Sequence, residues 1–220
     1  MTLTVAQFPT PRPSVAAGPI DPTIAPIGIS VRRAAGEEIF AEGEGAHTVY
    51  QVLSGTVRTY RLLGDGRRHV CDFHVPGDVL GLEATSAYCC SAEGMTDVVL
   101  HAIPLRTLRR LSADDAALGQ QLLSLATGGL QRSQNHASML ARLGATERVA
   151  AFLCDFARRF DAIDELTLPM TRQDIADYLG LTIHTVSRTL SQLQDQGLID
   201  ARASRRVRLR RQADLLGLCA

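Results

Sequence analysis

One stretch near the carboxyl end constrains the fold of this chain more than any other: residues 171–199, TRQDIADYLGLTIHTVSRTLSQLQDQGLI. The pattern predicts two short helices joined by a tight turn at Gly180, where a positive φ favours glycine. Thr171 and Asp174 have the spacing of a capping box with the shorter acid, so they mark the start of the first helix. We expect Thr182 to cap the second helix.

The apolar residues of this stretch recur where two crossing helices must touch: Ile175, Ala176, Leu179, Leu181, Val186 and Leu190. On the second helix, polar residues gather on the other side: Thr182, His184, Thr185, Ser187 and Arg188. An arginine paired with guanine is the commonest specific contact to a base. We therefore interpret the stretch as a helix-turn-helix whose second helix enters a DNA major groove. The alternative is a helical hairpin that only packs in a core.

The residues that follow are rich in arginine. Residues 198–202 and 206–210 alternate, or nearly so, and predict a β-hairpin with Val207 and Leu209 facing inward. The side chains expected to face outward are Arg206, Arg208 and Arg210. Six arginines fall within residues 202–211. The hairpin is thus predicted to be a basic wing that contacts phosphates, the alternative being a charged edge that prevents sheet aggregation.

Charge is unevenly distributed along the 220 residues, although the formal net charge is zero. Residues 171–220 hold eight arginines and five acids, a net charge of +3, and residues 1–170 carry the compensating −3. The basic excess therefore lies in the helix-turn-helix part. The sequence contains no apolar run of about 18 residues and no secretory leader pattern, so we expect neither a membrane span nor export.

Five cysteines occur, at positions 71, 89, 90, 154 and 219. Their number is odd and no pair has C-x-x-C spacing, so a disulfide framework is not expected and a reducing cytoplasmic setting fits. Cys89 and Cys90 are a candidate redox pair, because adjacent exposed thiols oxidise when their pKa is lowered. The alternative is that they are unreactive loop thiols, since no basic residue is close to them in sequence.

Short strands punctuated by glycine are predicted between residues 29 and 103. The expected strands cover 49–53, 57–62, 69–75 and 95–103, and their regular spacing indicates an antiparallel barrel or roll. Residues 1–28 hold six of the nine prolines and few periodic apolar residues, which predicts a loose arm.

A helical period follows. Eight residues are spaced alternately by four and three and form a heptad seam: Leu118, Leu122, Leu125, Gly129, Arg132, His136, Met139 and Leu143. A second stripe runs beside it: Leu123, Ala126, Leu130, Ser133, Ala137 and Leu140. Two stripes suggest one helix that faces both its own domain and a partner chain. We expect the first seam to form the contact between protomers, because a helix-turn-helix protein usually reads two half-sites roughly 34 Å apart. The alternative is a helix that packs only on the core of a monomer.

The combination of roll, long helix and winged helix-turn-helix resembles the cyclic-AMP receptor protein/FNR superfamily of bacterial transcription regulators, and within it the FixK-type regulators. Three motifs carry the resemblance: GEEIFAEGE at residues 36–44, PGD at 76–78 and HTVSR at 184–188. It covers about residues 30–218 and implies an α+β fold with an antiparallel, cyclic-nucleotide-binding-like β-roll. The implied division is an arm (1–28), the β-roll (29–111), a dimerisation helix (112–144) and the winged helix-turn-helix domain (145–220).

The resemblance also implies roles for individual residues. Arg188 would read a guanine, Ser187 a thymine or its neighbour, and His184 stands where most members carry a base-reading glutamate. The residues at positions that contact the DNA backbone are Thr171, Arg172, Thr182 and Thr185, to which the wing adds Arg202, Arg205, Arg206 and Arg208. The implied partners are double-stranded DNA with a palindrome such as TTG(A/C)-N6-(G/T)CAA, a second copy of the chain and RNA polymerase, with the protein acting as an activator.

The residues that such regulators use to sense a signal are missing. Leu82 stands where cyclic-nucleotide binders have a glutamate, and no arginine lies between Arg68 and Arg106 to meet a cyclic phosphate. No cysteine precedes Cys71, which excludes an iron–sulfur site in the arm. We expect no cofactor, no metal and no enzymatic activity. The alternatives are a regulator gated by a cyclic nucleotide or by oxidation, a β-roll ligand-binding module, and a cupin-like enzyme, which would need an H-x-H pair that the roll lacks.

Overall fold

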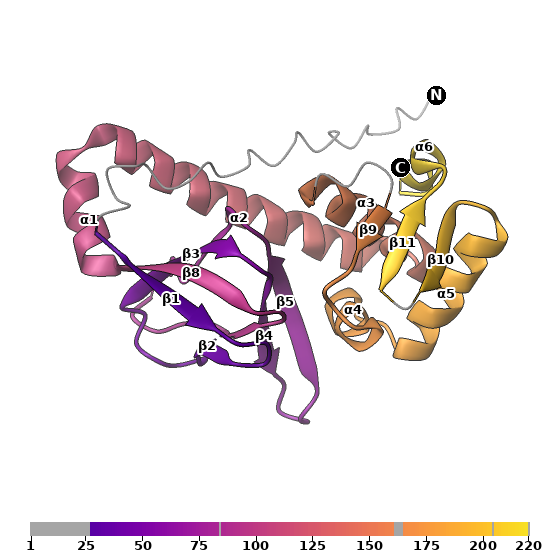
Figure 1. The fold of residues 1–220 in the computed structure, drawn as a ribbon, viewed down its shortest axis with the longest axis horizontal. Coiled ribbons are helices and arrows are strands. Elements are labelled where there is room, and N and C mark those ends of the chain that lie inside the picture. Colours follow the sequence, from indigo (N-terminus) through magenta and orange to yellow (C-terminus); the bar gives the residue numbers. More distant parts are fainter. Residues whose placement is uncertain (1–26, 84, 161–164, 204, 220) are drawn as a thin grey trace, which may run out of the picture.

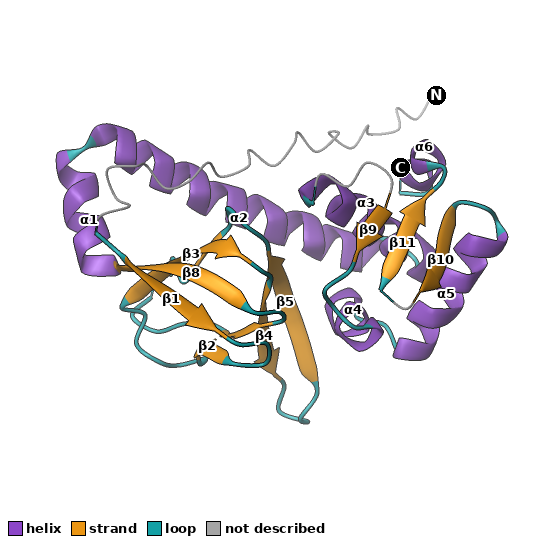
Figure 2. Ribbon diagram, in the orientation of Figure 1, coloured by secondary structure: helices purple, strands orange, loops and turns teal. Residues whose placement is uncertain are grey.

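The computed structural model describes residues 27–83, 85–160, 165–203 and 205–219, with only the backbone of Arg202 and Ala203 (Figure 1). It has the predicted α+β class: a β-roll, a long helix and a C-terminal domain of helices and a small sheet (Figure 2). Residues 1–26 of the predicted arm lie outside the described part of the chain.

The β-roll consists of two four-stranded antiparallel sheets, with the strand orders β1-β8-β3-β6 and β2-β7-β4-β5. The predicted strands are present, since they overlap β3, β4, β5 and β8. The strand bounds are β1 Ile29–Arg33, β2 Glu38–Phe40, β3 Thr48–Ser54, β4 Val57–Leu62, β5 Arg68–His74, β6 Val79–Leu80, β7 Ser91–Gly94 and β8 Val98–Pro104. Alternate residues of β8 (Val98, Leu100 and Ala102) are buried, because successive side chains of a strand point to opposite faces.

The turn between β3 and β4 requires its glycine. Gly55 has φ +83°, and a Cβ at this position would lie 2.3 Å from the carbonyl oxygen of Asp97. Side chains rarely adopt this backbone conformation, so glycine lets the chain reverse here against the neighbouring loop.

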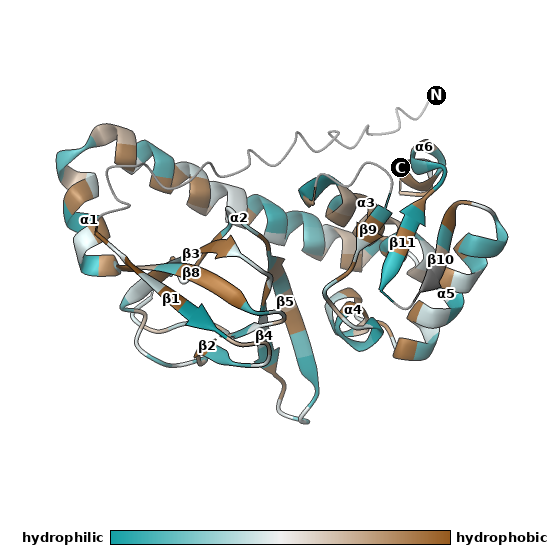
Figure 3. Ribbon diagram, viewed as in Figure 1, coloured by the Kyte–Doolittle hydropathy of each residue, from teal (hydrophilic) through white to brown (hydrophobic). Residues whose placement is uncertain are grey.

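Three helices follow the roll: α1 Leu105–Asp114, α2 Ala116–Arg142 and α3 Ala145–Arg159. The long helix α2 begins at Ala116 rather than at residue 112, because the Asp115 side chain accepts hydrogen bonds from the backbone N–H groups of Ala117 and Leu118. Apolar segments recur along the whole of α2 (Figure 3). No helix in the described ranges is long and apolar enough to cross a bilayer.

Most residues of the heptad seam of α2 contact other parts of the same chain. Leu118 is 2 % exposed and packs with Leu122 against the end of the roll, while Met139 packs on the core of the C-terminal domain. Arg132 pairs with Asp72 of β5 at 3.4 Å. His136 hydrogen-bonds the backbone carbonyl of Tyr178 at 2.9 Å. Leu125, Gly129 and Leu143 are half-buried, and the contact of the seam with a second protomer stays a prediction.

The second stripe of α2 is the one that faces solvent. Leu123 is 62 % exposed and Leu130 is 59 % exposed, and Ala126, Ser133 and Ala137 are exposed as well. Both stripes are apolar and share the heptad spacing, so periodicity alone could not assign a face to each.

The C-terminal domain holds the predicted helix-turn-helix and hairpin. Its elements are β9 Glu165–Thr167, α4 Arg172–Leu179, α5 Ile183–Asp195, β10 Ile199–Ala203, β11 Arg206–Leu209 and α6 Gln212–Gly217. β10 and β11 pair as an antiparallel hairpin, and β9, which was not predicted, joins the other edge of β11.

Candidate nucleic-acid interface

The turn between α4 and α5 has the predicted geometry. Gly180 is left-handed, with φ 61° and ψ 37°, and ends α4. At the start of α4, Thr171 and Asp174 form the expected capping box, in which the Thr171 hydroxyl accepts from the Asp174 N–H at 3.2 Å. The Thr182 hydroxyl accepts from the Thr185 N–H at 3.1 Å and caps α5. Both helices therefore start at the expected residues.

One face of α5 is fixed in the core. Val186, Leu190 and Leu193 are at most 4 % exposed and pack with Ile175, Ala176 and Leu179 of α4. His184 and Arg188, four positions apart, lie on the solvent side of the helix and are exposed, with Ser187 partly exposed beside them. The result is a rigid helix with a polar outer stripe of an arginine, an imidazole and a hydroxyl, which are groups that can hydrogen-bond base edges.

The wing presents arginines to solvent. The side chains of Arg206 and Arg208 are 69 % and 57 % exposed, whereas Val207 between them is buried. Each lies 3.8 Å from a carboxylate oxygen of Glu165 on β9. Sequence reasoning missed this acid, because a strand of three residues gives no periodic signal. Exposed ion pairs of this kind contribute little, so they leave both guanidinium groups available to another anion.

The remaining residues expected to contact a DNA backbone differ in their exposure and in their hydrogen bonds within the protein. Thr171 and Thr185 already make hydrogen bonds within the protein, the latter with the Thr182 hydroxyl at 2.9 Å. Arg172 is half-buried and Arg205 is exposed. The side chain of Arg202 lies outside the described residues.

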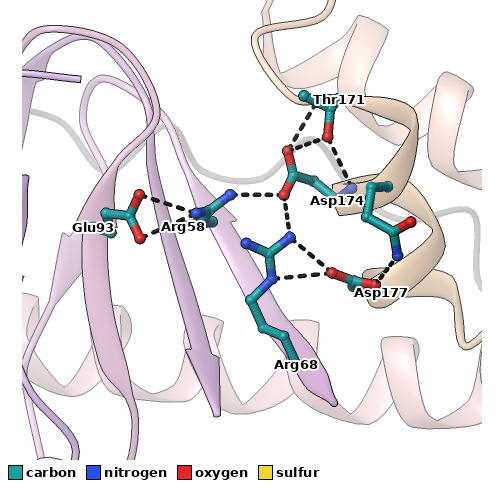
Figure 4. Close-up of polar contacts among 7 residues, drawn as sticks. Arg58, Arg68, Glu93, Thr171, Asp174 and Asp177 are labelled. Carbon is teal, nitrogen blue, oxygen red and sulfur yellow. Dashed lines mark hydrogen bonds and ion pairs between the residues drawn. The ribbon is translucent and has the colours of Figure 1, made fainter. Parts of the chain in front are cut away.

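A network of charged residues joins α4 to the β-roll (Figure 4). Asp174 accepts hydrogen bonds from Arg58 of β4 at 2.7 Å and from Arg68 of β5 at 2.5 Å. Arg68 also donates to Asp177, one turn along α4, at 2.7 Å. Glu93 of β7 holds the far side of Arg58 with two contacts of 3.0 Å. The first helix of the helix-turn-helix is therefore attached directly to the roll.

Burial and charge act in opposite directions on Asp174. Burial raises its pKa, but hydrogen bonds from Thr171 and the charges of Arg58 and Arg68 outweigh burial and bring the pKa below its usual value. The carboxylate is therefore ionised at neutral pH and can accept from both arginines.

A second contact between the domains is aromatic. Tyr178 of α4 stacks on His136 of α2, with ring centroids 4.0 Å apart, and lies 5.2 Å from the ring of Phe73 in β5. Burial lowers the pKa of His136, and the hydrogen bond with the Tyr178 carbonyl opposes this shift. Together with the charged network, this stack defines how the C-terminal domain sits on the roll.

Comparisons with known proteins agree with this architecture. A model of the Crp-like helix-turn-helix domain matches residues 147–218, and a model of the cyclic nucleotide-binding domain matches residues 30–115. The chain belongs to the CRP/FNR family of transcription regulators. Its relatives in this family include two proteins called nitrogen fixation regulation protein FixK. One, from Rhizobium meliloti, is 44 % identical over 184 residues, which cover 84 % of each chain.

The other, from Azorhizobium caulinodans, is 43 % identical over 197 residues, which cover 87 % of this chain and 79 % of the relative. The solved structure of FixK2 from Bradyrhizobium japonicum is similar with a TM-score of 0.85 and 40 % identity, covering 88 % of this chain and 98 % of the other. A CooA structure from Carboxydothermus hydrogenoformans has a TM-score of 0.76 at 19 % identity, which is a likeness of fold alone. This member of the CRP/FNR family is therefore a FixK-like transcription regulator with a helix-turn-helix DNA-binding domain.

Stacked aromatic side chains lie in the interior of its roll, among aliphatic ones. Phe40 and Tyr88 stack with centroids 3.8 Å apart, and Tyr50 packs against the same cluster. The Tyr88 hydroxyl donates to the Thr48 carbonyl at 2.7 Å, which fixes the ring. Leu82, at the position where cyclic-nucleotide binders are expected to have a glutamate, packs on an apolar cluster instead.

Proposed function

We propose that this protein is a homodimeric, sequence-specific activator that binds a palindrome of the type TTG(A/C)-N6-(G/T)CAA and contacts RNA polymerase in the cytoplasm. The observation that carries the proposal is the outer stripe of α5, where His184, Ser187 and Arg188 share the solvent side of a helix whose opposite face is fixed in the core. Similarity to the FixK proteins supports the choice of palindrome.

In this proposal three side chains read bases. Arg188 donates two hydrogen bonds to a guanine, and Ser187 contacts the neighbouring thymine. His184 accepts from a cytosine amino group when its imidazole is neutral and can only donate when it is protonated. The base opposite His184 is therefore the one at which this operator departs from that of relatives with a glutamate.

The sequence-independent contacts come from the helix starts and the wing. Thr171, Arg172, Thr182 and Thr185 lie at or near the N-terminal ends of α4 and α5, where backbone N–H groups and the helix dipole favour phosphates. Arg202, Arg205, Arg206 and Arg208 add positive charge along the wing. Such contacts position the protein on the duplex and do not specify sequence.

We propose further that the solvent-facing stripe of α2 joins two protomers, and that DNA binding needs no small effector. The exposed Leu123 and Leu130 support the first point, because a surface helix rarely leaves two leucines seven residues apart in water without a partner. Leu82 and the stacked aromatic side chains of the roll support the second. The amount of protein made would then set its activity.

The test compares Arg188→Ala with Arg206→Ala, by measuring Kd for the palindrome and for a scrambled duplex over a series of salt concentrations. Arg188→Ala should lower the preference for the palindrome by about 1–3 kcal/mol. Arg206→Ala should weaken binding to both duplexes and reduce the salt slope by about one unit.

Equal loss of preference in both variants would contradict these roles, and a wild-type protein without preference for the palindrome would overturn the proposed operator. Addition of cyclic nucleotide should leave the affinity and the melting temperature unchanged, because only a ligand that binds the native state raises stability.

A further inference from the structure

Two of the five cysteines meet a carboxylate beside the β-roll. Ligand atoms of Glu83, Cys89 and Cys90 all lie within 4.8 Å of one another, and the Cys89 thiol donates to a Glu83 carboxylate oxygen at 3.4 Å. Both cysteines are free thiols. The loop before β7 therefore brings two sulfurs and one carboxylate together.

The Cys89–Cys90 dipeptide is held on both sides. The N–H of Tyr88 donates to the Glu44 carbonyl at 2.9 Å, and the Tyr88 ring is buried against Phe40. On the other side, Ser91 opens β7 and pairs with Tyr60. Cys89 is exposed and Cys90 is buried. The cluster is therefore open to solvent at Cys89 and anchored in the roll at Cys90.

The spacing of these ligand atoms suits a metal ion. A tetrahedral metal with bonds of about 2.3 Å to sulfur keeps its sulfurs about 3.8 Å apart. The ligand atoms of Glu83, Cys89 and Cys90 already lie within 4.8 Å of one another.

We propose that Glu83, Cys89 and Cys90 bind one thiophilic divalent cation of the Zn²⁺ class in each protomer. Two thiolates and a carboxylate supply three donors of a tetrahedral site and leave the fourth position to a water molecule, and soft sulfur ligands select zinc over magnesium or calcium. Arg61 lies near Cys89 and offsets part of the negative charge. The ion replaces the thiol protons and links Glu83 to Cys89 and Cys90 across the loop before β7, so Cys89 and Cys90 are ligands and neither a redox pair nor unreactive thiols.

The experiment titrates the reduced, metal-free full-length protein with Co²⁺ and with Cd²⁺, and follows thiolate-to-metal charge-transfer absorption. We expect one ion per protomer, displaced by Zn²⁺. Cys89→Ser should weaken binding at least about 100-fold, because loss of an outer-shell partner alone costs roughly 10–100-fold. Cys89 is exposed, so this variant should keep its circular dichroism and its DNA binding. Glu83→Gln should keep the sulfur absorption while binding more weakly.

The matched control is Cys219→Ser, which removes a free thiol of the C-terminal domain and should bind as the wild type does. Absence of charge-transfer absorption in the wild type would overturn the proposal. So would unchanged binding in Cys89→Ser, or equal loss in Cys219→Ser. None of these results depends on operator recognition, so the site and the proposed function can fail separately.

Discussion

At the scale of single residues, Asp174 has two functions. It closes the capping box of α4 with Thr171, and it accepts from Arg58 and Arg68 across the boundary between the domains. Its side chain is 4 % exposed. A buried carboxylate of this kind is tolerated because the guanidinium groups of Arg58 and Arg68 neutralise it. Removing the charge of the carboxylate leaves those guanidinium groups uncompensated.

Asp174→Asn should therefore lower the free energy of unfolding by about 3 kcal/mol. Urea titrations followed by circular dichroism measure the change. The control is Asp195→Asn on the exposed end of α5, which should change stability by less than about 0.5 kcal/mol. Similar losses in the two variants would show that the network adds nothing.

The same carboxylate gives the chain an acid-sensitive element. Because the folded-state pKa of Asp174 is lowered, its contribution is fully present above the unfolded value of about 3.9. The contribution disappears as the pH falls through the lowered folded pKa. The difference in stability between wild type and Asp174→Asn should thus be constant from pH 7 to about pH 5 and shrink below pH 4. A difference that instead grows on acidification would refute this account.

At the scale of elements, α2 has two apolar faces with different surroundings. The seam residues Leu118, Leu122 and Met139 pack within the protomer, and the stripe that includes Leu123 and Leu130 faces solvent. A helix that serves as the spine of its own chain and as the contact to a second copy needs both stripes.

Leu123→Glu combined with Leu130→Glu should raise the dissociation constant of the proposed dimer more than 100-fold, since burying each leucine contributes about 1.5–3 kcal/mol. Sedimentation equilibrium measures this. Gln131→Glu is the matched control, because Gln131 is exposed on the same helix and hydrogen-bonds only Asn135 among the contacts described. Dimers of unchanged affinity in the double variant would assign the interface to another surface.

At the scale of the whole molecule, the DNA-binding domain is docked on the roll through groups that titrate. His136 of α2 lies between Tyr178 of α4 and His69 of β5, with Asp72 also near, and burial lowers its pKa. Burial also lowers the pKa of His74, at the end of β5. Protonation of His136 therefore works against the docked arrangement, and protonation of His74, which contacts Thr59 of β4, works against the folded roll.

Because both folded-state pKa values are lowered, the stabilisation is complete above the unfolded histidine value of about 6.5 and is lost as the pH falls toward the folded values. The free energy of unfolding should fall as the pH is lowered from 7 to 5. His136→Phe should make this pH dependence less steep, and the part of the dependence that is due to His74 should remain. His47→Gln, at an exposed position, should leave the slope unchanged. A slope that His136→Phe does not alter would exclude this histidine as the cause.

Much of the helix-turn-helix follows from local sequence. The Thr171–Asp174 box, the Thr182 cap and the left-handed Gly180 are set by residues within four positions of each other, so the pattern alone located them. Strand alternation likewise located β3, β4, β5 and β8 and the hairpin of the wing. The base-reading roles of His184, Ser187 and Arg188 stay predictions, as do the domain boundaries at 111 and 144.

Only the tertiary structure decided which stripe of α2 faces inward, because two apolar stripes of equal period are distinguished only by what packs against them. It alone added β9 with Glu165 to the wing, and it alone joined Arg58 to Asp174 across 116 positions of the chain. The fold likewise brought Glu83 to Cys89 and Cys90. The physical reason is the same each time: local patterns fix backbone conformation, whereas contacts between distant residues depend on how whole elements pack.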